Sequence, residues 1–530
     1  MVMMLSPLLN TRNLMLLPDP AKHIGLLVVT GVLLLVPGCA TEEVEYPVVF
    51  EPNLVHTMKY QLKEDISMDE ASKDSTWVVD TMFGNPDVPM LPTVIAEDED
   101  LANIVNMDLL EHASGPATEE GRGLFRALCA NCHGVTGDGR GKDASAQMPY
   151  PRDYRMGIFK FKSTPRGDKP TKEDLARVIR NGIAGTNMLS AAKLLETENF
   201  RRKQNNEPPL NFKEVTEKDI QALADYVVYL SLRGEHERQQ VDVGIFEQIL
   251  EGGDRLINSD VGQNFNWADR DKRDSLEKEL ESLEEQQASL EKQIELLDSK
   301  GESSESEKAR LEEITESVEN LERFEEEWEY AEEYAAEIAE AWLDGEDAVV
   351  EVPEPPADLP LAESSADVER LKSGPQAQEF AASLQRGHEL FIGKMALCSK
   401  CHGEKGLGDG QTTDYDDWTK DWTKNANLDP KNREKLIPLL ARGALPPVNI
   451  IPRNFSEGVF RGGATSKDLY LRITQGIEGT PMSAATFVEG QFEPEDVWHL
   501  INFIRSLEKP ESNPQAATQD TTLNLTKAAP

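Results

Sequence analysis

Two short clusters of cysteine and histidine are the residues of this chain whose types and spacing could do chemistry. They are Cys129-Ala-Asn-Cys132-His133 and Cys398-Ser-Lys-Cys401-His402. A pair of cysteines at this spacing can form two thioethers with the vinyl groups of one haem, which places the adjoining histidine under the iron as its proximal ligand. The pattern therefore predicts two covalently bound haem c groups, one at each cluster.

A redox-active disulfide or half of a zinc site is the alternative interpretation of each cysteine pair. The chain has 5 cysteines, and the one outside the two clusters, Cys39, closes a hydrophobic leader. Neither alternative explains why a histidine follows both pairs. No second cysteine pair lies near either cluster to complete a zinc site. The spacing therefore favours haem.

The two clusters lie in stretches of sequence that repeat each other. The matching blocks are residues 121–125 with 387–391, 151–160 with 452–461, and 171–188 with 465–482. Thr171 and Thr465 each precede an aspartate by three residues, which predicts a capping box at the start of a helix. Residues 215–232 and 496–507 have apolar positions at helical spacing, and we expect them to close the two units.

Each unit resembles a class I cytochrome c domain, in which an early helix and C-x-x-C-H are followed by a loop and a late methionine before a closing helix. The resemblance covers roughly half of the chain. It implies that Met188 and Met482 are the distal iron ligands, because a thioether favours ferrous iron and gives the potential of an electron carrier. Met148, Met156 and Met395 are alternatives without a counterpart in the other repeat, and we expect each to pack in a core.

Arg152 and Arg453 follow a proline at equivalent places in the two units. In the family a proline carbonyl often accepts from the proximal histidine, and nearby basic residues pair with haem propionates. The resemblance thus implies haem contacts for both arginines, and a surface position is the alternative. Two pairs of equivalent aromatic residues are expected to form haem-packing core: Tyr154 with Phe455, and Phe159 with Phe460.

An acidic segment with apolar residues at three-four spacing separates the repeats. It predicts two long helices folded as an antiparallel coiled-coil hairpin, each arm about 40–50 Å long. The hairpin is either a spacer or a surface that dimerises or binds a partner helix. We therefore expect a mainly α fold with two class I cytochrome c-like helical domains separated by this hairpin. The expected divisions are a lipoprotein signal peptide or anchor (1–39), a tether (40–115), cytochrome c domain 1 (116–235), the acidic hairpin with a Pro-rich linker (236–374), cytochrome c domain 2 (375–509) and a disordered tail (510–530).

The N-terminal part resembles a bacterial export signal. Basic residues precede an apolar stretch at 24–36, which is shorter than the roughly 20 residues that span a bilayer. Residues 36–39 resemble a lipobox, which implies lipidation of Cys39, although Pro37 is unusual at its place. An uncleaved anchor and ordinary signal cleavage are the alternatives. Each of these interpretations puts the rest of the chain outside the cytoplasm, and we expect a periplasmic, membrane-anchored lipoprotein.

Haem coordination favours electron transfer, and the charge of the chain argues against one other class of function. The chain has 530 residues and a formal net charge of −41, which argues against binding to nucleic acid. Both irons would be six-coordinate with no catalytic constellation beside them, so we expect an electron carrier and not an enzyme. Respiratory complexes or other cytochromes are the expected partners, and the chain could itself be a subunit of a respiratory oxidoreductase. The alternatives are a dihaem peroxidase-like enzyme, with His112, His388 or His499 as an unexpected ligand, and a scaffold acting through its coiled coil.

Overall fold

The structure is a computed structural model that describes residues 48–117, 121–246, 255–411, 415–416, 419, 423 and 428–509. Within these ranges the chain is mainly helical, and its only extended pairings are isolated bridges. The predicted mainly α fold is confirmed. No helix of the described part is long and apolar enough to cross a membrane. The leader with Cys39 and the tail after Lys509 lie outside the described residues.

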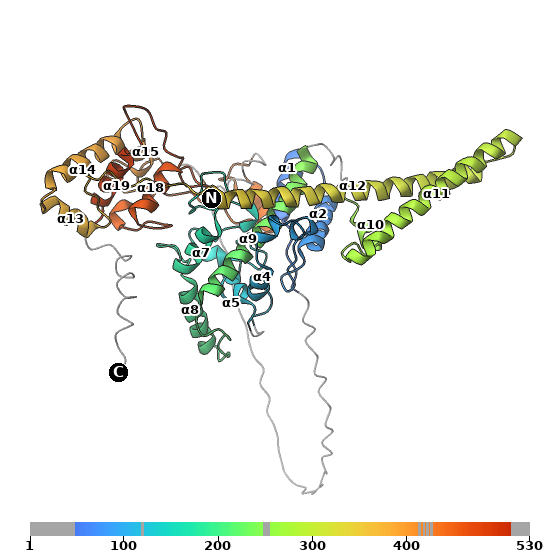
Figure 1. Ribbon diagram of the computed structural model, residues 1–530, viewed down its shortest axis with the longest axis horizontal. Coiled ribbons are helices and arrows are strands. Elements are labelled where there is room, and N and C mark those ends of the chain that lie inside the picture. The colour runs from blue at the N-terminus through green and yellow to red at the C-terminus, as the bar shows by residue number, and fades with distance from the viewer. Residues whose placement is uncertain are drawn as a thin grey trace, which may run out of the picture. The chain divides into compact units, whose positions relative to one another are not determined.

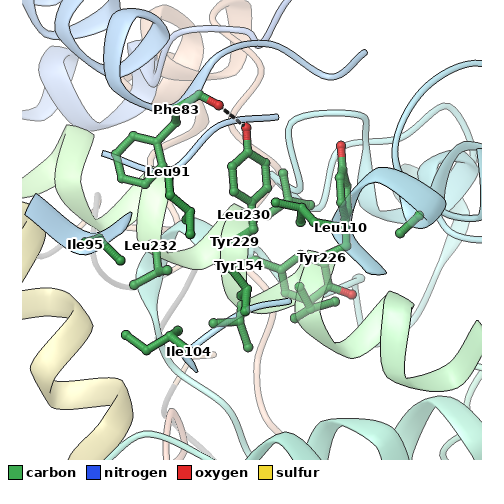
Figure 2. Packing of buried hydrophobic residues seen from close by; sticks show 14 of the residues in the cluster. Phe83, Leu91, Ile95, Ile104, Leu110, Tyr154, Tyr226, Tyr229, Leu230 and Leu232 are labelled. Atoms are coloured by element: carbon green, nitrogen blue, oxygen red, sulfur yellow. Dashed lines mark hydrogen bonds between the residues drawn. The ribbon is translucent and has the colours of Figure 1, made fainter. Parts of the chain in front are cut away.

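The first unit is organised around one long helix, α9 (Glu217–Phe246), most of which is buried. The elements of this unit between residue 121 and α9 are α5 (Leu124–Leu128), α6 (Ala130–His133), η2 (Ala144–Ala146), η3 (Tyr154–Met156), α7 (Lys172–Asn181) and α8 (Ala191–Gln204). Figure 2 shows Tyr226, Tyr229 and Leu230 of α9 among apolar side chains of other elements. The middle of α9 is apolar on several faces, and such a helix is stable only when other elements enclose it. The predicted closing helix is confirmed and continues to Phe246.

Residues 48–113 form part of the core of this unit. They contain α1 (Leu54–Glu64), α2 (Asp69–Phe83), α3 (Thr93–Ala96), η1 (Leu101–Asn103) and α4 (Met107–Ala113). Phe83 and Ile95 are fully buried in the same hydrophobic cluster as Tyr229. The Tyr229 hydroxyl donates to the Phe83 carbonyl (2.5 Å; Figure 2). The prediction of a tether at 40–115 is therefore wrong for the described part. Its short apolar clusters pack against residues far away in the sequence and so become part of a core.

In the described part of the chain between α9 and residue 348 there are three helices, and the last of them also belongs to the first unit. They are α10 (Ser259–Asn264), α11 (Arg270–Lys300) and α12 (Glu305–Asp347). α12 contacts α9, α3 and η1 as well as α11. Trp328 and Trp342 of α12 are each 3% exposed and lie in the hydrophobic core of the first unit. A ring nitrogen of His236 in α9 lies 2.7 Å from the carbonyl of Ala331 in α12. The hairpin segment after residue 235 is therefore not a domain separate from the first unit.

The pair α11 and α12 has the two long helices and the polar break that the sequence predicts. Residues 301–304 join the helices, which lie side by side (Figure 1). Gln287, which interrupts the apolar stripe of α11, donates to the Thr315 hydroxyl of α12 (3.1 Å). The interruption is thus satisfied by a polar partner across the pair. Coiled-coil packing along the pair stays a prediction.

The second unit packs two helices, α14 and α19, closely together. Its elements are α13 (Ser365–Ser373), α14 (Ala377–Ile392), α15 (Cys398–His402), α17 (Arg433–Ala441), η4 (Phe455–Glu457), α18 (Ser466–Thr474) and α19 (Asp496–Ser506). A Cβ on Gly387 of α14 would lie 2.1 Å from the carbonyl of His499 in α19, so only glycine permits this approach. Phe391 and Trp498 are buried beside this crossing. The helix predicted at 496–507 is confirmed.

Both predicted capping boxes are present, one in each unit. The Thr171 hydroxyl accepts from the Asp174 amide (3.1 Å), and the Asp174 carboxylate accepts from the Thr171 amide (3.3 Å). Thr465 and Asp468 make the same two bonds at 3.1 and 3.0 Å. Each box satisfies amides that a helix start leaves without a partner. The caps therefore fix where α7 and α18 begin. Each of these helices is followed by the loop that carries the late methionine.

Candidate haem sites

Each cysteine motif lies on one helical turn. In the first unit this turn is α6 with Cys129 as its N-cap, and in the second unit it is α15. All four cysteines of the motifs are partly buried, and none of them forms a disulfide within the described residues. Burial raises the pKa of Cys129 to about 12 and that of Cys398 to about 11. Burial thus disfavours the thiolate, which is the form in which a redox-active cysteine reacts. The described residues also contain no cluster of three or more side chains able to hold a metal ion.

The histidines of the two motifs have the same orientation. His133 Nδ1 lies 3.1 Å from the Arg152 carbonyl, and His402 Nδ1 lies 3.1 Å from the Arg453 carbonyl. Because a carbonyl only accepts, each Nδ1 donates, which leaves Nε2 unprotonated in the neutral ring and able to bind a metal. Burial lowers the pKa of His133 to about 4, so its ring is neutral at pH 7. The acceptor is the arginine carbonyl, and not the proline carbonyl that the family resemblance led us to expect.

Behind each imidazole, two aromatic rings follow in a stack. The Tyr154 ring lies 4.7 Å from the His133 ring, and the Phe455 ring lies 4.5 Å from the His402 ring. The second rings, 6.1 and 6.2 Å further on, are Phe159 and Phe460. All four aromatic residues are buried, as expected for core positions. The stacks restrict rotation of the imidazoles and so complement their hydrogen bonds.

Glycines shape the loop that follows each motif. The amides of Gly139 and Gly408 donate to the carbonyls of the motif histidines (2.8 and 2.9 Å). Their φ angles are 72° and 74°, in the left-handed region. A Cβ on Gly139 would lie 2.7 Å from the Pro151 carbonyl, and one on Gly408 would lie 2.5 Å from the Pro452 carbonyl. Both the backbone angle and the close approach therefore require glycine at these two positions.

The two late methionines lie in loops with the same hydrogen-bond pattern. The Met188 amide donates to the Thr186 hydroxyl (3.1 Å), and the Ile183 amide donates to the Met188 carbonyl (2.7 Å). The equivalent bonds of the second unit run from Met482 to Thr480 (3.2 Å) and from Ile477 to Met482 (2.9 Å). The loops therefore fix the backbone on both sides of each methionine in the same way.

Arg152 and Arg453 each lie against the methionine loop of the other unit. Arg152 Nη1 is 3.7 Å from the Cβ position of Gly479, and Arg453 Nη1 is 3.6 Å from that of Gly185. Arg152 Nη1 is buried and has no hydrogen-bond partner among the residues that the structure describes. A buried guanidinium nitrogen without an acceptor is costly, and a haem propionate would supply the acceptor.

These features together fit a c-type haem in each unit. The paired thiols on one turn match the two vinyl groups, and each imidazole presents Nε2 while Nδ1 is engaged. The methionine loops offer a thioether from a backbone held in the same conformation in both units. A bound haem would supply two covalent thioethers, an iron that changes between ferrous and ferric states, and propionates for basic side chains.

The alternative methionines do not occupy the positions that the sequence suggested. Met148 is 68% exposed and Met395 is 36% exposed, while Met156 is half-buried. The expectation that all three pack in a core is therefore wrong. Their environments differ, so these three methionines do not form an equivalent pair of iron ligands in the two units.

The three alternative histidines have structural contacts. His112 uses both ring nitrogens, one 2.5 Å from the Gly121 carbonyl and the other 2.6 Å from the Asp219 carboxylate. His499 Nδ1 lies 2.8 Å from the Ser383 hydroxyl. The remaining ring, that of His388, packs 5.1 Å from the ring of Phe503. Binding of iron by either ring nitrogen of His112 would break the polar contact that this nitrogen makes.

Two residues beside the second site were not predicted from the sequence. Lys162 and Arg166 belong to the first repeat, but they contact the loop that carries Met482. They lie in a stretch between Lys160 and Thr171 that is longer than its counterpart in the second repeat. This extra length is the sequence feature that could have drawn attention to Lys162 and Arg166. It does not reveal which residues the stretch contacts.

Comparison with known families agrees with this geometry. Residues 118–231 and 384–508 match the family model of cytochrome c. The chain therefore contains two cytochrome c domains, and each carries a covalently bound c-type haem. The cysteine pairs Cys129/Cys132 and Cys398/Cys401 fit the attachment motif of the family.

Comparison with individual proteins adds little beyond the family. One similar solved structure is the Kuenenia stuttgartiensis reducing HAO-like protein complex Kustc0457/Kustc0458, with 19% sequence identity over 74% of this chain and 99% of that chain. Its TM-score is 0.35, which is too low to support an argument about fold or function. No curated protein matches this chain.

Proposed function

We propose that this chain is a membrane-attached dihaem electron carrier of a respiratory chain. Its cytochrome c domains imply electron transfer. In this proposal His133 and Met188 bind the first iron, and His402 and Met482 bind the second. A thioether ligand stabilises ferrous iron and gives a relatively high potential. An iron with six ligands passes electrons without binding a substrate.

The observation that carries the proposal is one backbone frame repeated around two histidines and two methionines. Each histidine donates from Nδ1 to an arginine carbonyl at 3.1 Å. Each methionine amide donates to a threonine hydroxyl, at 3.1 and 3.2 Å. A dihaem enzyme needs one iron with an open or displaceable distal position, and therefore two different sites. Two equivalent frames instead support two sites with the same ligands and the same task.

Contacts between the domains support transfer of electrons from one haem to the other within the chain. Besides the two arginines, Val459 lies 2.8 Å from the Cβ position of Gly185, and Ile158 lies 3.4 Å from that of Gly479. Equivalent residues thus make equivalent contacts, as in a symmetric dimer interface. The interface contains both methionine loops and both proposed propionate partners, which favours a short path between the two haems.

We further propose a periplasmic location and a lipid on Cys39, on the basis of the leader and the lipobox in the sequence. A lipid would raise the effective concentration of the domains near membrane complexes without changing their intrinsic affinity. Respiratory complexes or other cytochromes are therefore the proposed partners, with the hairpin as a surface for a further helix. Cys39→Ser should move the protein into the soluble periplasmic fraction with its haem content unchanged. Retention of this variant in the membrane would contradict the lipid anchor.

The decisive experiment is a redox titration of the intact purified protein, followed by absorption spectroscopy. Haem is counted on the same sample by the pyridine haemochrome method. We expect two low-spin haems per chain, with methionine-ligand absorption that Met188→Ala and Met482→Ala each reduce. A high-spin or low-potential haem would favour the peroxidase-like enzyme, and peroxide turnover would then be measured. Fewer than two haems per chain would refute the proposal.

A further inference from the structure

We propose that residues 161–169 of the first cytochrome c domain, here called the clasp, hold the loop that carries Met482 in the second domain. Arg166 and Lys162 are then positioning residues for the distal ligand of the second haem. The inference rests on the proposed function, because it takes Met482 as that ligand. The clasp lies in the longer stretch of the first repeat, between Lys160 and Thr171.

Arg166 contacts the backbone of the methionine loop at three points. Its Nη1 donates to the carbonyls of Ile477 (3.2 Å) and Met482 (3.1 Å), and its Nη2 donates to the Thr480 carbonyl (3.2 Å). A guanidinium has several donors in one rigid plane, so one side chain can bind carbonyls on both sides of a tight loop. Two of these carbonyls precede the methionine and the third is its own, so the fork opposes any widening of the loop before Met482.

Lys162 adds an ion pair that is shielded from solvent. Its ammonium pairs with the carboxylate of Glu478, and the two side chains are 5% and 16% exposed. The Gly167 amide also donates to this carboxylate (3.4 Å). Because a buried charge without its partner is strongly unfavourable, the pair resists separation more than a surface pair does. Arg166 is itself exposed, so its bonds compete with water, and Lys162 supplies the better protected contact.

The start of the clasp is fixed on the second domain near α18. The Phe161 ring lies where a Cβ on Gly462 would be only 2.3 Å away, so the ring covers this glycine. Arg472 of α18 lies 5.4 Å from the centre of the same ring, and its Nη1 donates to the Lys162 carbonyl (3.1 Å). Arg472 is 6% exposed. The second domain therefore holds the segment from which Lys162 and Arg166 extend.

Among the described residues, no side chain forms an equivalent fork on the loop of Met188. Within the described ranges, the guanidinium bond it receives from the second domain runs from Arg461 Nη2 to the Gly185 carbonyl (3.2 Å). The clasp thus distinguishes two loops whose internal hydrogen bonds are alike. Loosening of the clasp should weaken the thioether bond at the second iron and leave the first iron unchanged.

The test uses the full chain with both haems bound and imidazole as the probe, because imidazole binds iron only after the methionine leaves. In Arg166→Ala, we expect imidazole to bind one haem about tenfold more tightly, which corresponds to the net loss of about one hydrogen bond. That haem should be the one that Met482→Ala perturbs, and its potential should fall. Lys162→Met should act in the same direction, and Arg166→Lys should give a smaller effect.

Arg180→Ala is the matched control, because it removes a guanidinium whose partners, Glu173 and Glu217, belong to the first domain. It should leave both haems unchanged. If Arg166→Ala and Lys162→Met both retain wild-type imidazole affinity and potentials while Met482→Ala does not, the clasp is refuted and the electron carrier stands. If Met482→Ala leaves both haem spectra unchanged, the ligand assignment fails and the clasp proposal fails with it. If Arg166→Ala or Lys162→Met loses haem, the imidazole affinity and the potentials are measured on Arg166→Lys instead.

Discussion

The replacement Phe83→Ala tests whether residues 48–113 belong to the core of the first domain. Phe83 ends α2 and is fully buried, with its ring 6.2 Å from that of Tyr229 and 5.6 Å from that of His236. The bond from the Tyr229 hydroxyl goes to the backbone carbonyl and survives the change. The variant therefore loses packing alone. Truncation of a buried phenylalanine costs about 3–5 kcal/mol, so the unfolding equilibrium constant should rise by roughly two to three and a half orders of magnitude.

The assay is guanidinium unfolding of the haem-bound protein, followed through the methionine-ligand absorption of the haem in the first domain. Met188→Ala identifies which absorption belongs to that haem. Phe200→Ala is the matched control, because Phe200 lies in α8 of the same domain and is 64% exposed. If the two variants lower the free energy of unfolding by similar amounts, residues 48–113 do not share the core and the reasoning is wrong.

Three further predictions concern protonation, haem attachment and a helix cap. Burial lowers the pKa of His236 to about 4, below its value of about 6.5 in the unfolded chain. The contribution of the neutral ring to the free energy of unfolding is therefore fully present above about pH 6.5. It falls by up to about 3 kcal/mol as the pH decreases to 4. His236→Gln should reduce this slope in urea titrations at each pH, and an unchanged slope would contradict it. Replacement of Cys398 and Cys401 by serine should leave one covalently bound haem per chain by pyridine haemochrome, and two would exclude this attachment site. Asp174→Ala should lower the free energy of unfolding of the first domain by about 2 kcal/mol in guanidinium, because the carboxylate caps α7 and accepts from the Ser163 amide (2.7 Å); no loss would show that the cap is unimportant.

Features that depend on neighbours in the sequence could be predicted without the structure. The haem motif places its cysteines and histidine on one turn, so their spacing alone defines the chemistry. The caps at Thr171 and Thr465 need only an aspartate three residues further on. The closing helices follow from the period of their apolar residues. In each case the interacting groups lie within one or two helical turns of each other.

Contacts between distant residues could not be predicted in this way. Phe83 and Tyr229 are 146 positions apart, and Arg166 and Thr480 are 314 positions apart. An apolar stripe shows that a helix has a covered face, but it does not show what covers it. For this reason the sequence predicts the hairpin of α11 and α12 but not the burial of Trp328 and Trp342 in the core of the first domain. The clasp was missed for the same reason.

The burial of α12 has a mechanical consequence. This helix has 43 residues and therefore extends about 65 Å as one continuous element. The amide of Lys172, at the start of α7, donates to the Glu346 carboxylate near the end of α12 (2.6 Å). To pivot the hairpin, the helix must bend or withdraw Trp328 and Trp342, at a cost of about 4–6 kcal/mol for each indole. A pull on the tip of the hairpin would therefore act as a torque on the first haem domain.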